Sequence, residues 1–154
     1  MQGSSKLGFG MMRLPQLSGE ATDSDFAQVN RMVDCFLEAG FTYFDTSWAY
    51  HNTASETAVQ KCLASRYPRE RFVLASKLPT FAITREEEVE PLFAGQLARC
   101  GVDYFDYYLL HNVNWMRYTR IIREAHLFDH MKRWKEQGKI RHIAISYHDT
   151  GDVL

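Results

Sequence analysis

The chain has little that points to a membrane, a nucleic acid or a disulfide framework. Its 154 residues include only three cysteines and four prolines, and 18 basic against 19 acidic side chains give a net charge of −1. Such a balance creates no field that attracts nucleic acid or an anionic membrane. No apolar run reaches the roughly 20 residues that cross a bilayer, and the amino terminus lacks a signal-peptide core. We expect a cytoplasmic protein that binds neither nucleic acid nor membrane.

The three cysteines are odd in number and widely spaced. They are Cys35, Cys62 and Cys100, and no two form a CxxC motif. Each lies in a segment with helical periodicity, and free cysteines are among the most buried residue types. We therefore expect three buried thiols in a reducing compartment.

What the chain does have is a regular alternation of strand-like and helix-like segments. Apolar residues make up 45% of the sequence and aromatic residues 14%, which is typical of a globular domain with a core. Apolar runs predict strands at 7–10, 41–44, 72–76, 105–110 and 140–145. Helical periodicity predicts helices with apolar faces at 26–37, at 53–63, from 84 through 97 with Gly101 as the stop, and at 128–134.

Two predicted helix starts carry a threonine followed three residues later by a glutamate. Thr53 and Glu56 form one pair, and Thr84 and Glu87 form the other. In a capping box, both side chains bond to free backbone N–H groups at the helix start. We predict capping boxes at both positions.

Four strand–helix repeats and a fifth strand predict an α/β fold with a parallel sheet. A closed (β/α)8 TIM barrel typically needs about 250 residues. We therefore expect residues 1–154 to form a single incomplete domain: a partial (β/α)8 TIM barrel with the first five strands and four helices. Residues 1–5 (MQGSS) are interpreted as an added or rebuilt terminus. An open five-stranded α/β sheet is the competing architecture.

Three titratable side chains stand at the carboxyl ends of successive predicted strands. These are Asp45, Lys77 and His111, and Tyr50 follows Asp45 by five residues. Barrel enzymes build their active sites at this end of the sheet. An ammonium stabilises a phenolate and eases proton release, a carboxylate positions the ammonium, and a histidine orients a carbonyl. The set suits proton delivery to a carbonyl oxygen while a cofactor supplies hydride.

Each of these residues also has a structural interpretation. An aspartate after a strand often belongs to a turn, and Asp45 precedes Thr46 and Ser47. Lys77 is consistent with a solvated lysine, and His111 with a hydrogen-bonded histidine in a loop. Their shared position at matching strand ends favours the functional interpretation.

Other patterns carry less weight. His126 and His130 lie one helical turn apart, but residue 127 is leucine rather than the glutamate of a zinc-protease helix. We expect no metal site. Core packing is expected for Tyr107 and Tyr108, and a place in the wall of a substrate pocket for Trp115.

Five stretches of the sequence follow a known pattern: LGFGMMRLP (7–15), AGFTYFDTSWAY (39–50), LASKL (74–78), DYFDYYLLH (103–111) and GKIRHIAIS (138–146). They resemble the aldo-keto reductase family of nicotinamide-dependent (β/α)8 barrels. The resemblance implies Tyr50 as the general acid, with Asp45, Lys77 and His111 completing a tetrad. It also implies NADP(H) or NAD(H) as cofactor and a small-molecule aldehyde or ketone as substrate.

The same resemblance implies a cofactor site at the ends of the first and fifth strands. Gly10, Met11 and Met12 match the loop that approaches the nicotinamide, and Asp45 belongs to the same site. Ser146 matches a residue that contacts the nicotinamide carboxamide.

Parts of the sequence are most similar to one bacterial branch, whose longer members carry a carboxyl-terminal iron–sulfur domain. These parts are MMRLP (11–15) and SYHD (146–149). Ala144 and Tyr147 depart from the family, which commonly has glycine and asparagine there. Strands six to eight have no counterpart, and barrels commonly bind phosphate after strands seven and eight. We therefore expect the chain alone to bind a dinucleotide cofactor poorly.

We expect an NAD(P)H-dependent carbonyl reductase of this type, truncated and weak or inactive alone. The alternative is a non-catalytic half-barrel or interaction module that associates through open sheet edges, with itself or with a complementary half-barrel. A third hypothesis is a non-catalytic relative that uses the cofactor-binding fold for regulation. The intact tetrad argues against it.

Overall fold

The computed structural model describes residues 6–20 and 22–153, so the interpretation of residues 1–5 lies outside the described part. Five parallel strands form one sheet, in which each strand pairs with the next along the chain. The strands are Gly8–Gly10 (β1), Tyr43–Asp45 (β2), Val73–Pro79 (β3), Phe105–Val113 (β4) and Ile140–Tyr147 (β5).

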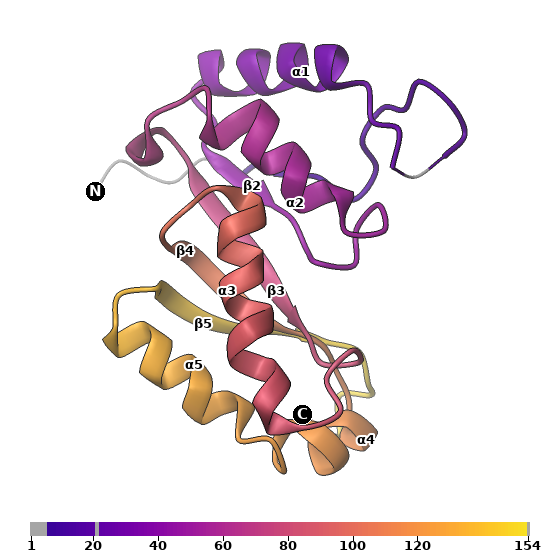
Figure 1. The fold of residues 1–154 in the computed structure, drawn as a ribbon, viewed down its shortest axis with the longest axis vertical. Helices are drawn as coiled ribbons and strands as arrows, with labels where there is room; N and C mark the ends of the chain where they lie inside the picture. Colours follow the sequence, from indigo (N-terminus) through magenta and orange to yellow (C-terminus); the bar gives the residue numbers. More distant parts are fainter. Residues whose placement is uncertain (1–5, 21, 154) are drawn as a thin grey trace.

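Helices connect successive strands (Figure 1). The α-helices are Phe26–Glu38 (α1), Ala54–Val59 (α2), Val89–Cys100 (α3), Trp115–Arg117 (α4) and Leu127–Glu136 (α5). Short 3-10 or π-helical segments adjoin them: Gln60–Ala64 (η1), Arg69–Arg71 (η2), Glu86–Glu88 (η3) and Tyr118–Ile122 (η4). Within the described ranges, no helix combines the length and apolarity needed to span a bilayer.

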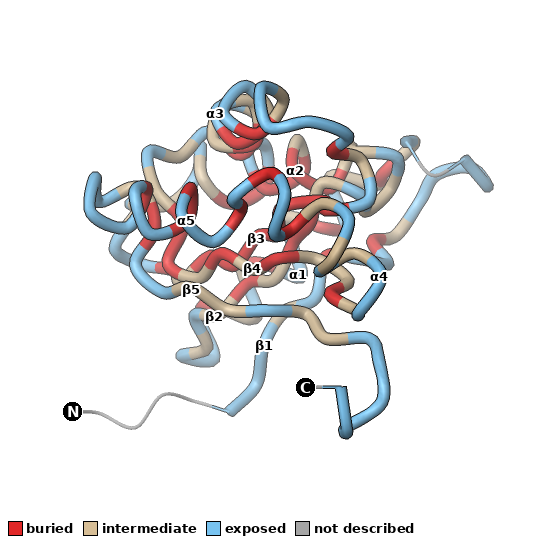
Figure 2. The backbone as a smooth tube through the Cα atoms, turned by 90° about the horizontal axis from the view of Figure 1, so that it is seen from below, coloured by how far each residue is buried: buried red, intermediate tan, exposed pale blue. Residues whose placement is uncertain are grey.

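The strand order follows the chain, as in a barrel. A doubly wound sheet reverses its order at a switch point, and this sheet has no such point among its described strands. Because side chains alternate between the faces of a strand, Phe44 packs in the core while Tyr43 and Asp45 face the other side. Figure 2 shows α2, α3 and α5 on one side of the sheet, with buried residues between. The predicted partial barrel is confirmed.

Aromatic side chains fill the core at both ends of the sheet. Near β1, the Phe36 ring of α1 contacts the rings of Phe9 and Phe44, with centroids 5.5 and 5.2 Å away. Beyond β4, the Phe93 ring of α3 stacks on Trp134 of α5 at 3.8 Å. These contacts attach α1 to the first two strands and join α3 to α5.

The predicted capping box at Thr53 is wrong. Thr53 has a left-handed conformation (φ 72°), and its side chain makes no capping bond. The Glu56 carboxylate is fully buried and accepts hydrogen bonds from Gln96 at 2.6 Å and Arg99 at 2.7 Å. Burial raises the pKa of the Glu56 carboxyl. The glutamate thus joins α2 to α3 instead of capping α2.

The box predicted at Thr84 is shifted by one residue. The carboxylate that accepts from the Thr84 N–H, at 2.9 Å, is that of Glu88 rather than Glu87. A 3-10 turn, η3, precedes α3 and places Glu88 where a regular helix start would place Glu87.

The cysteine prediction holds for two of the three residues. Cys62 and Cys100 are buried free thiols, but Cys35 is exposed. Its position on α1 explains the difference, because the helix buries the face that carries Val29 and Val33 and leaves Cys35 towards solvent.

The connection between β4 and α5 has two short helices that the sequence analysis does not predict. It contains the short helices α4 and η4. Strands β3, β4 and β5 also extend beyond their predicted ends, to Pro79, Val113 and Tyr147. Lys77 and His111 therefore lie within β3 and β4 rather than in the loops that follow them.

Replacing Phe93 with alanine is expected to lower the free energy of unfolding by about 3–5 kcal/mol, the usual cost of emptying a buried aromatic site. Phe93 is 1% exposed and stacked on Trp134. Urea denaturation followed by circular dichroism measures the change. Leu17→Ala is the control, because Leu17 is 71% exposed and should change the value by less than about 0.5 kcal/mol. Equal values for both variants would contradict the packing described.

Candidate active site

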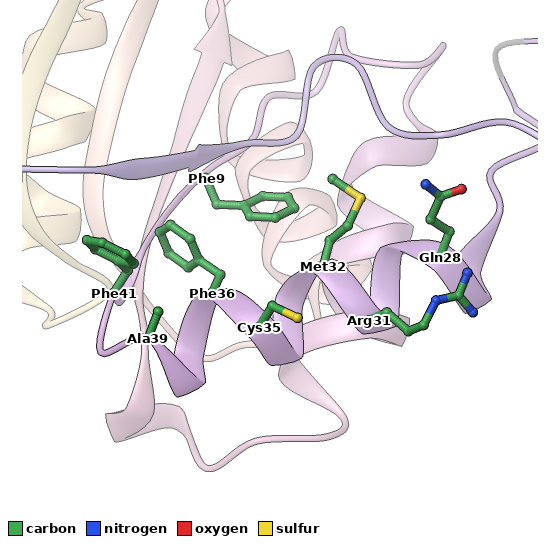
Figure 3. Close-up of a pocket in the computed structure, with 8 residues that line it drawn as sticks. All are labelled: Phe9, Gln28, Arg31, Met32, Cys35, Phe36, Ala39 and Phe41. Atoms are coloured by element: carbon green, nitrogen blue, oxygen red, sulfur yellow. The ribbon is translucent and has the colours of Figure 1, made fainter.

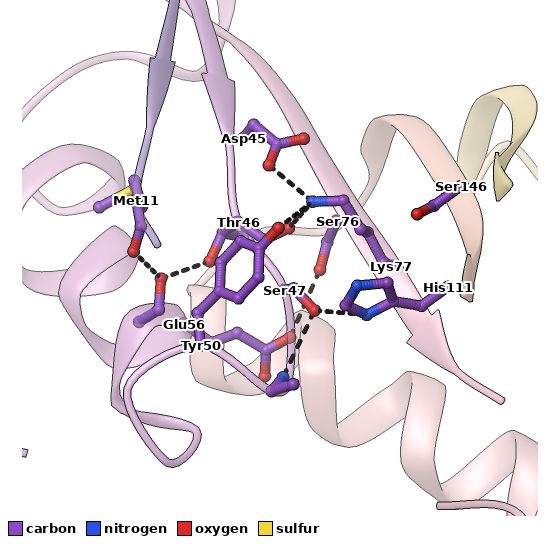
Figure 4. A network of polar contacts seen from close by, with 12 residues as sticks. Met11, Asp45, Thr46, Ser47, Tyr50, Glu56, Ser76, Lys77, His111 and Ser146 are labelled. Atoms are coloured by element: carbon purple, nitrogen blue, oxygen red, sulfur yellow. Dashed lines mark hydrogen bonds and ion pairs between the residues drawn. The ribbon is translucent and has the colours of Figure 1, made fainter. Parts of the chain in front are cut away.

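The face of the sheet that packs against the helices and contains Phe44 is its outer face, and the opposite face, with Asp45, is its inner face. Lys77 carries a buried ammonium on the inner face (Figure 4). Its Nζ donates to Asp45 Oδ1 at 2.6 Å, to the Thr46 carbonyl oxygen at 2.9 Å and to the Tyr50 hydroxyl oxygen at 3.1 Å. The residue is only 6% exposed, and burying an unpaired charge is costly. Asp45 and Thr46 supply the pairing. Three of the four predicted catalytic residues therefore meet at one amine.

The strand register explains this convergence. Asp45 lies opposite Ala75, and Lys77 lies opposite Leu109. Lys77 is two residues beyond Ala75, and His111 is two residues beyond Leu109, so both stay on the same face of their strands. Each polar side chain therefore lies two residues closer to the carboxyl end of its strand than the residue paired with the polar side chain of the preceding strand.

Tyr50 comes from the loop after β2, which turns back towards the sheet. Residues 51–53 all have positive φ, between 49° and 72°. Non-glycine residues rarely adopt this conformation, and surrounding contacts must hold it. One such contact is the Leu14 N–H, which donates to His51 Nε2 at 2.9 Å. The loop after β1 thus supports the turn that presents Tyr50.

His111 reaches the site from β4. Asn112 has a φ of 61°, and the pairing of β4 with β5 shifts register between Leu110 and Val113. The strand is therefore irregular beside His111. Its ring lies edge-on to Tyr50, with centroids 6.1 Å apart.

The His111 imidazole is neutral near pH 7. Burial is the main cause that lowers its pKa, to about 4, and the positive charges of Lys77 and Arg117 and the nearby His148 act in the same direction. A neutral imidazole can donate one hydrogen bond from one ring nitrogen and accept one at the other.

The predicted cofactor residues after β1 have different surroundings. A Cβ atom on Gly10 would meet nothing within 4 Å, so space lies open beside this residue. The Met11 N–H donates to the Asp45 carbonyl oxygen at 2.9 Å, and its side chain is fully buried in the core. Met12 is 55% exposed. Gly10 and Met12 are therefore exposed, whereas Met11 is buried with both backbone polar groups hydrogen-bonded.

Ser146 lies on β5, apart from the four tetrad residues (Figure 4). Its Oγ is 2.9 Å from His148 Nε2. The neighbouring Tyr147 packs against the core, and its hydroxyl donates to the Thr150 carbonyl oxygen at 2.6 Å. Tyr147 therefore lies on the outer face, away from the tetrad.

Three buried hydroxyls near the site were not predicted as functional. Thr46 Oγ1 lies 2.8 Å from Ser55 Oγ, which donates to the Met11 carbonyl oxygen at 3.0 Å. Ser47 Oγ lies 3.0 Å from His111 Nδ1. The only sequence signal was that Thr46 and Ser47 directly follow Asp45, which is also typical of a turn.

The structure offers no support for a metal at His126, which precedes α5, and His130, which lies within it. His130 is 4% exposed and contacts the carboxylates of Glu86 and Glu90 at 3.0 and 3.2 Å, while His126 is exposed. Among residues 6–20 and 22–153, no three His, Cys, Asp or Glu side chains form a group that could hold a metal ion.

Two aromatic predictions need correction. Tyr108 is fully buried, but Tyr107 is half-buried on the inner face, where it stacks on His142 at 4.8 Å. Trp115 does line a hollow, but this hollow includes Ile145 and Tyr147 of the outer face of β5. Tyr107 and Tyr108 are neighbours on β4, and side chains alternate between the faces of a strand, so only one of the two can face the core.

Comparison with known proteins gives one consistent result. The model of the aldo/keto reductase family matches residues 6–153. An aldo-keto reductase from Mycobacterium avium (strain 104) is 33% identical over 153 residues, which cover 96% of this chain and 46% of that relative. The chain thus spans about half the length of the curated relatives it matches.

Solved structures agree with this match. An aldo-keto reductase from Bacillus halodurans, in its holo form, aligns with a TM-score of 0.73 and 27% identity. One from Klebsiella pneumoniae in complex with NADPH aligns with a TM-score of 0.72 and 25% identity. Each alignment covers 94% of this chain and 46% of the solved chain.

Acid is expected to destabilise the folded chain partly through His111. Its pKa is about 4 in the folded chain, against about 6.5 for an unperturbed histidine. Between these values the unfolded chain binds a proton that folded His111 does not, so the free energy of unfolding falls as pH falls. Urea titrations at about pH 7.5 and about pH 4.5 should show a smaller acid-induced loss for His111→Gln than for the wild-type chain.

His126→Gln serves as the matched control, since His126 is exposed. It should keep the acid-induced loss of the wild-type chain. An equal loss in His111→Gln and wild type would mean that His111 is not held neutral in the folded chain.

Proposed function

This chain belongs to the aldo/keto reductase family, and from that premise we propose that it supplies the proton-donating part of a carbonyl reductase. The proposed substrate is a small aldehyde or ketone, and the proposed cofactor is NADP(H) or NAD(H). The Klebsiella pneumoniae relative with bound NADPH supports the cofactor class. Three free cysteines suit a cytoplasmic location.

One observation carries the proposal: the Lys77 ammonium lies 3.1 Å from the Tyr50 hydroxyl oxygen while ion-paired with Asp45 at 2.6 Å. A cation this close stabilises the phenolate that remains when tyrosine gives up its proton. The pairing with Asp45 keeps the amine charged in a buried place. Tyr50 is therefore suited to act as a general acid.

These positions support the following reaction. The substrate carbonyl oxygen accepts hydrogen bonds from Tyr50 and His111, which polarise the C=O bond. A bound nicotinamide cofactor supplies the hydride that bonds to the carbonyl carbon. The C=O π electrons move to oxygen and take the Tyr50 proton, which gives the alcohol. Lys77 holds the phenolate until a proton from solvent restores the phenol.

The inner face of the sheet suits the nicotinamide end of the cofactor. Open space beside Gly10 would admit a flat ring near Asp45. The Ser146 hydroxyl, on β5 at the opposite edge of the sheet, is a donor and acceptor for a carboxamide. Gly10, Met12, Asp45 and Ser146 would hold this end.

The described strands offer less for the phosphate end of the cofactor. Barrels commonly bind phosphate after strands seven and eight, whereas the described sheet has five strands. We therefore propose that the chain alone holds the cofactor weakly and turns over slowly. Titration with NADPH, followed by tryptophan fluorescence, should give no saturation at micromolar concentrations.

The role of Tyr50 is testable in a fusion of this chain to the carboxyl-terminal half of the Mycobacterium avium relative. Such a fusion should bind NADPH and reduce aldehydes. Tyr50→Phe should lower its kcat by about 10²- to 10⁴-fold, the usual contribution of a positioned acid. The dissociation constant for NADPH, measured by fluorescence, should stay within about twofold because the hydroxyl acts only on the substrate.

Tyr104→Phe is the matched control. Tyr104 lies just before β4, at the opposite end of the strands, and its hydroxyl accepts a hydrogen bond from Arg141. This variant should keep the kcat of the parent fusion. A Tyr50→Phe fusion that binds NADPH and reduces aldehydes at the parent rate would end the proposal.

A second candidate function, association with a complementary half-barrel, rests on two apolar hollows. One hollow, of about 520 Å³, lies beside edge strand β1 (Figure 3). The other, of about 300 Å³, lies beside edge strand β5. The apolar lining of the first includes Phe9, Met32, Phe36 and Phe41, and that of the second Trp115, Tyr118, Phe128, Ile145 and Tyr147.

Both hollows flank an open edge of the sheet, where unpaired backbone groups invite another strand. Exposed apolar patches on soluble proteins mark interaction sites. A barrel of this class has eight strands, and five are present. Three further β/α repeats close such a barrel, whereas a second copy of this chain would bring five. The proposed occupant is therefore a segment of three β/α repeats whose helices fill the two hollows.

Co-expression with the carboxyl-terminal half of a matched relative should yield a one-to-one complex, measured by size-exclusion chromatography with light scattering. Ile145→Lys should abolish the complex, because Ile145 lies on edge strand β5 and is 37% exposed. Leu17→Lys should leave it intact, since Leu17 is 71% exposed and outside both hollows. A homodimer that does not bind the co-expressed half would favour self-association. A chain that stays monomeric in the presence of that half would contradict edge pairing.

A further inference from the structure

Ser47 is a fully buried serine whose hydroxyl touches the His111 ring (Figure 4). Its Oγ lies 3.0 Å from His111 Nδ1. The Ala49 N–H donates to the same oxygen at 3.4 Å. The three groups form a short chain of hydrogen bonds from the backbone to the imidazole.

The hydroxyl proton of Ser47 has one acceptor in the described part of the chain, and this is His111 Nδ1. If Nδ1 carried a proton and donated to Ser47, the hydroxyl proton would be buried without an acceptor. An unsatisfied buried donor is costly. The arrangement in which every group is satisfied has the Ser47 O–H donating to an unprotonated Nδ1.

We propose that Ser47 is a positioning residue that holds His111 in the tautomer with its proton on Nε2. This inference rests on the proposed function, because it concerns how His111 meets a carbonyl. A hydroxyl on the Nδ1 side leaves Nε2 as the donor. The bond also restrains the rotation of the ring about its side-chain torsions.

This tautomer would give the site two hydrogen-bond donors, His111 Nε2 and the Tyr50 hydroxyl, for one substrate carbonyl oxygen. Figure 4 shows the second ring nitrogen of His111 on the side of Tyr50 and Lys77. With the proton on Nε2, the imidazole and the Tyr50 hydroxyl can both donate to one carbonyl oxygen. With the proton on Nδ1, Nε2 would present a lone pair to that oxygen and repel it. Ser47 therefore decides whether His111 attracts or repels the substrate.

The tautomer can be measured on the chain as it exists, without cofactor or turnover. Long-range ¹H–¹⁵N correlation spectra of histidine-labelled protein near neutral pH distinguish protonated from unprotonated ring nitrogens, and His111→Gln assigns the signals. We expect His111 to show an unprotonated Nδ1 and a protonated Nε2. In Ser47→Ala the two ¹⁵N shifts should move towards each other as the tautomers mix, and Ser47→Thr should retain the wild-type pattern.

Ser65→Ala is the control, since Ser65 is exposed and its hydroxyl donates to the Lys61 carbonyl oxygen instead of contacting a histidine. It should leave the His111 shifts unchanged. A wild-type spectrum with the proton on His111 Nδ1 would overturn the proposal even if Ser47→Ala fails to fold. Unchanged His111 shifts in folded Ser47→Ala would overturn it as well.

A kinetic measurement on the fusion separates this inference from the proposed function. Ser47→Ala should lower kcat/KM for an aldehyde by about tenfold or more, the effect of losing one oriented donor, and Ser47→Thr should restore it. An inactive parent fusion would count against the proposed function while leaving the tautomer measurement valid. An active fusion in which Ser47→Ala costs nothing would reject the role of Ser47 alone.

Discussion

A buried ammonium on the inner face of the sheet is the constraint on which the site depends. Lys77 has three N–H donors, and they meet Asp45, the Thr46 carbonyl and the Tyr50 hydroxyl. A lysine this deeply buried is stable as a cation only when such partners are present. The contacts that make the folded charge tolerable therefore also create the acid–base geometry. Local stability and chemistry cannot be separated here.

A second layer of polar contacts supports Lys77 from the outer face. Gln96 of α3 donates to the Lys77 carbonyl oxygen at 3.1 Å and to the buried Glu56 carboxylate at 2.6 Å. Arg99 completes the neutralisation of Glu56. Helices α2 and α3 are thereby tied to the backbone of β3 directly behind the amine. This buried network holds the strand that carries the charge.

The sheet is thus covered in its middle and open at its edges. Helices and a filled core cover its outer face, whereas edge strands β1 and β5 each lie beside an apolar hollow. The tetrad needs only β2, β3, β4 and the loop after β2, so its geometry forms within five strands. Phosphate binding in a barrel depends on later strands. This division is the physical basis of the proposal that the chain holds the proton-donating residues in place but binds the cofactor weakly.

The sequence by itself determined the strand–helix alternation, the parallel partial barrel and the positions of Asp45, Lys77 and His111 at matching strand ends. These features follow from hydrophobic periodicity and chain order, which are local properties. Only the tertiary structure decided that Glu56 joins two helices and that Ser47 bonds His111. Those outcomes depend on contacts between residues distant in the chain, such as the 64 positions that separate Ser47 from His111. Periodicity within one element carries no information about such pairs.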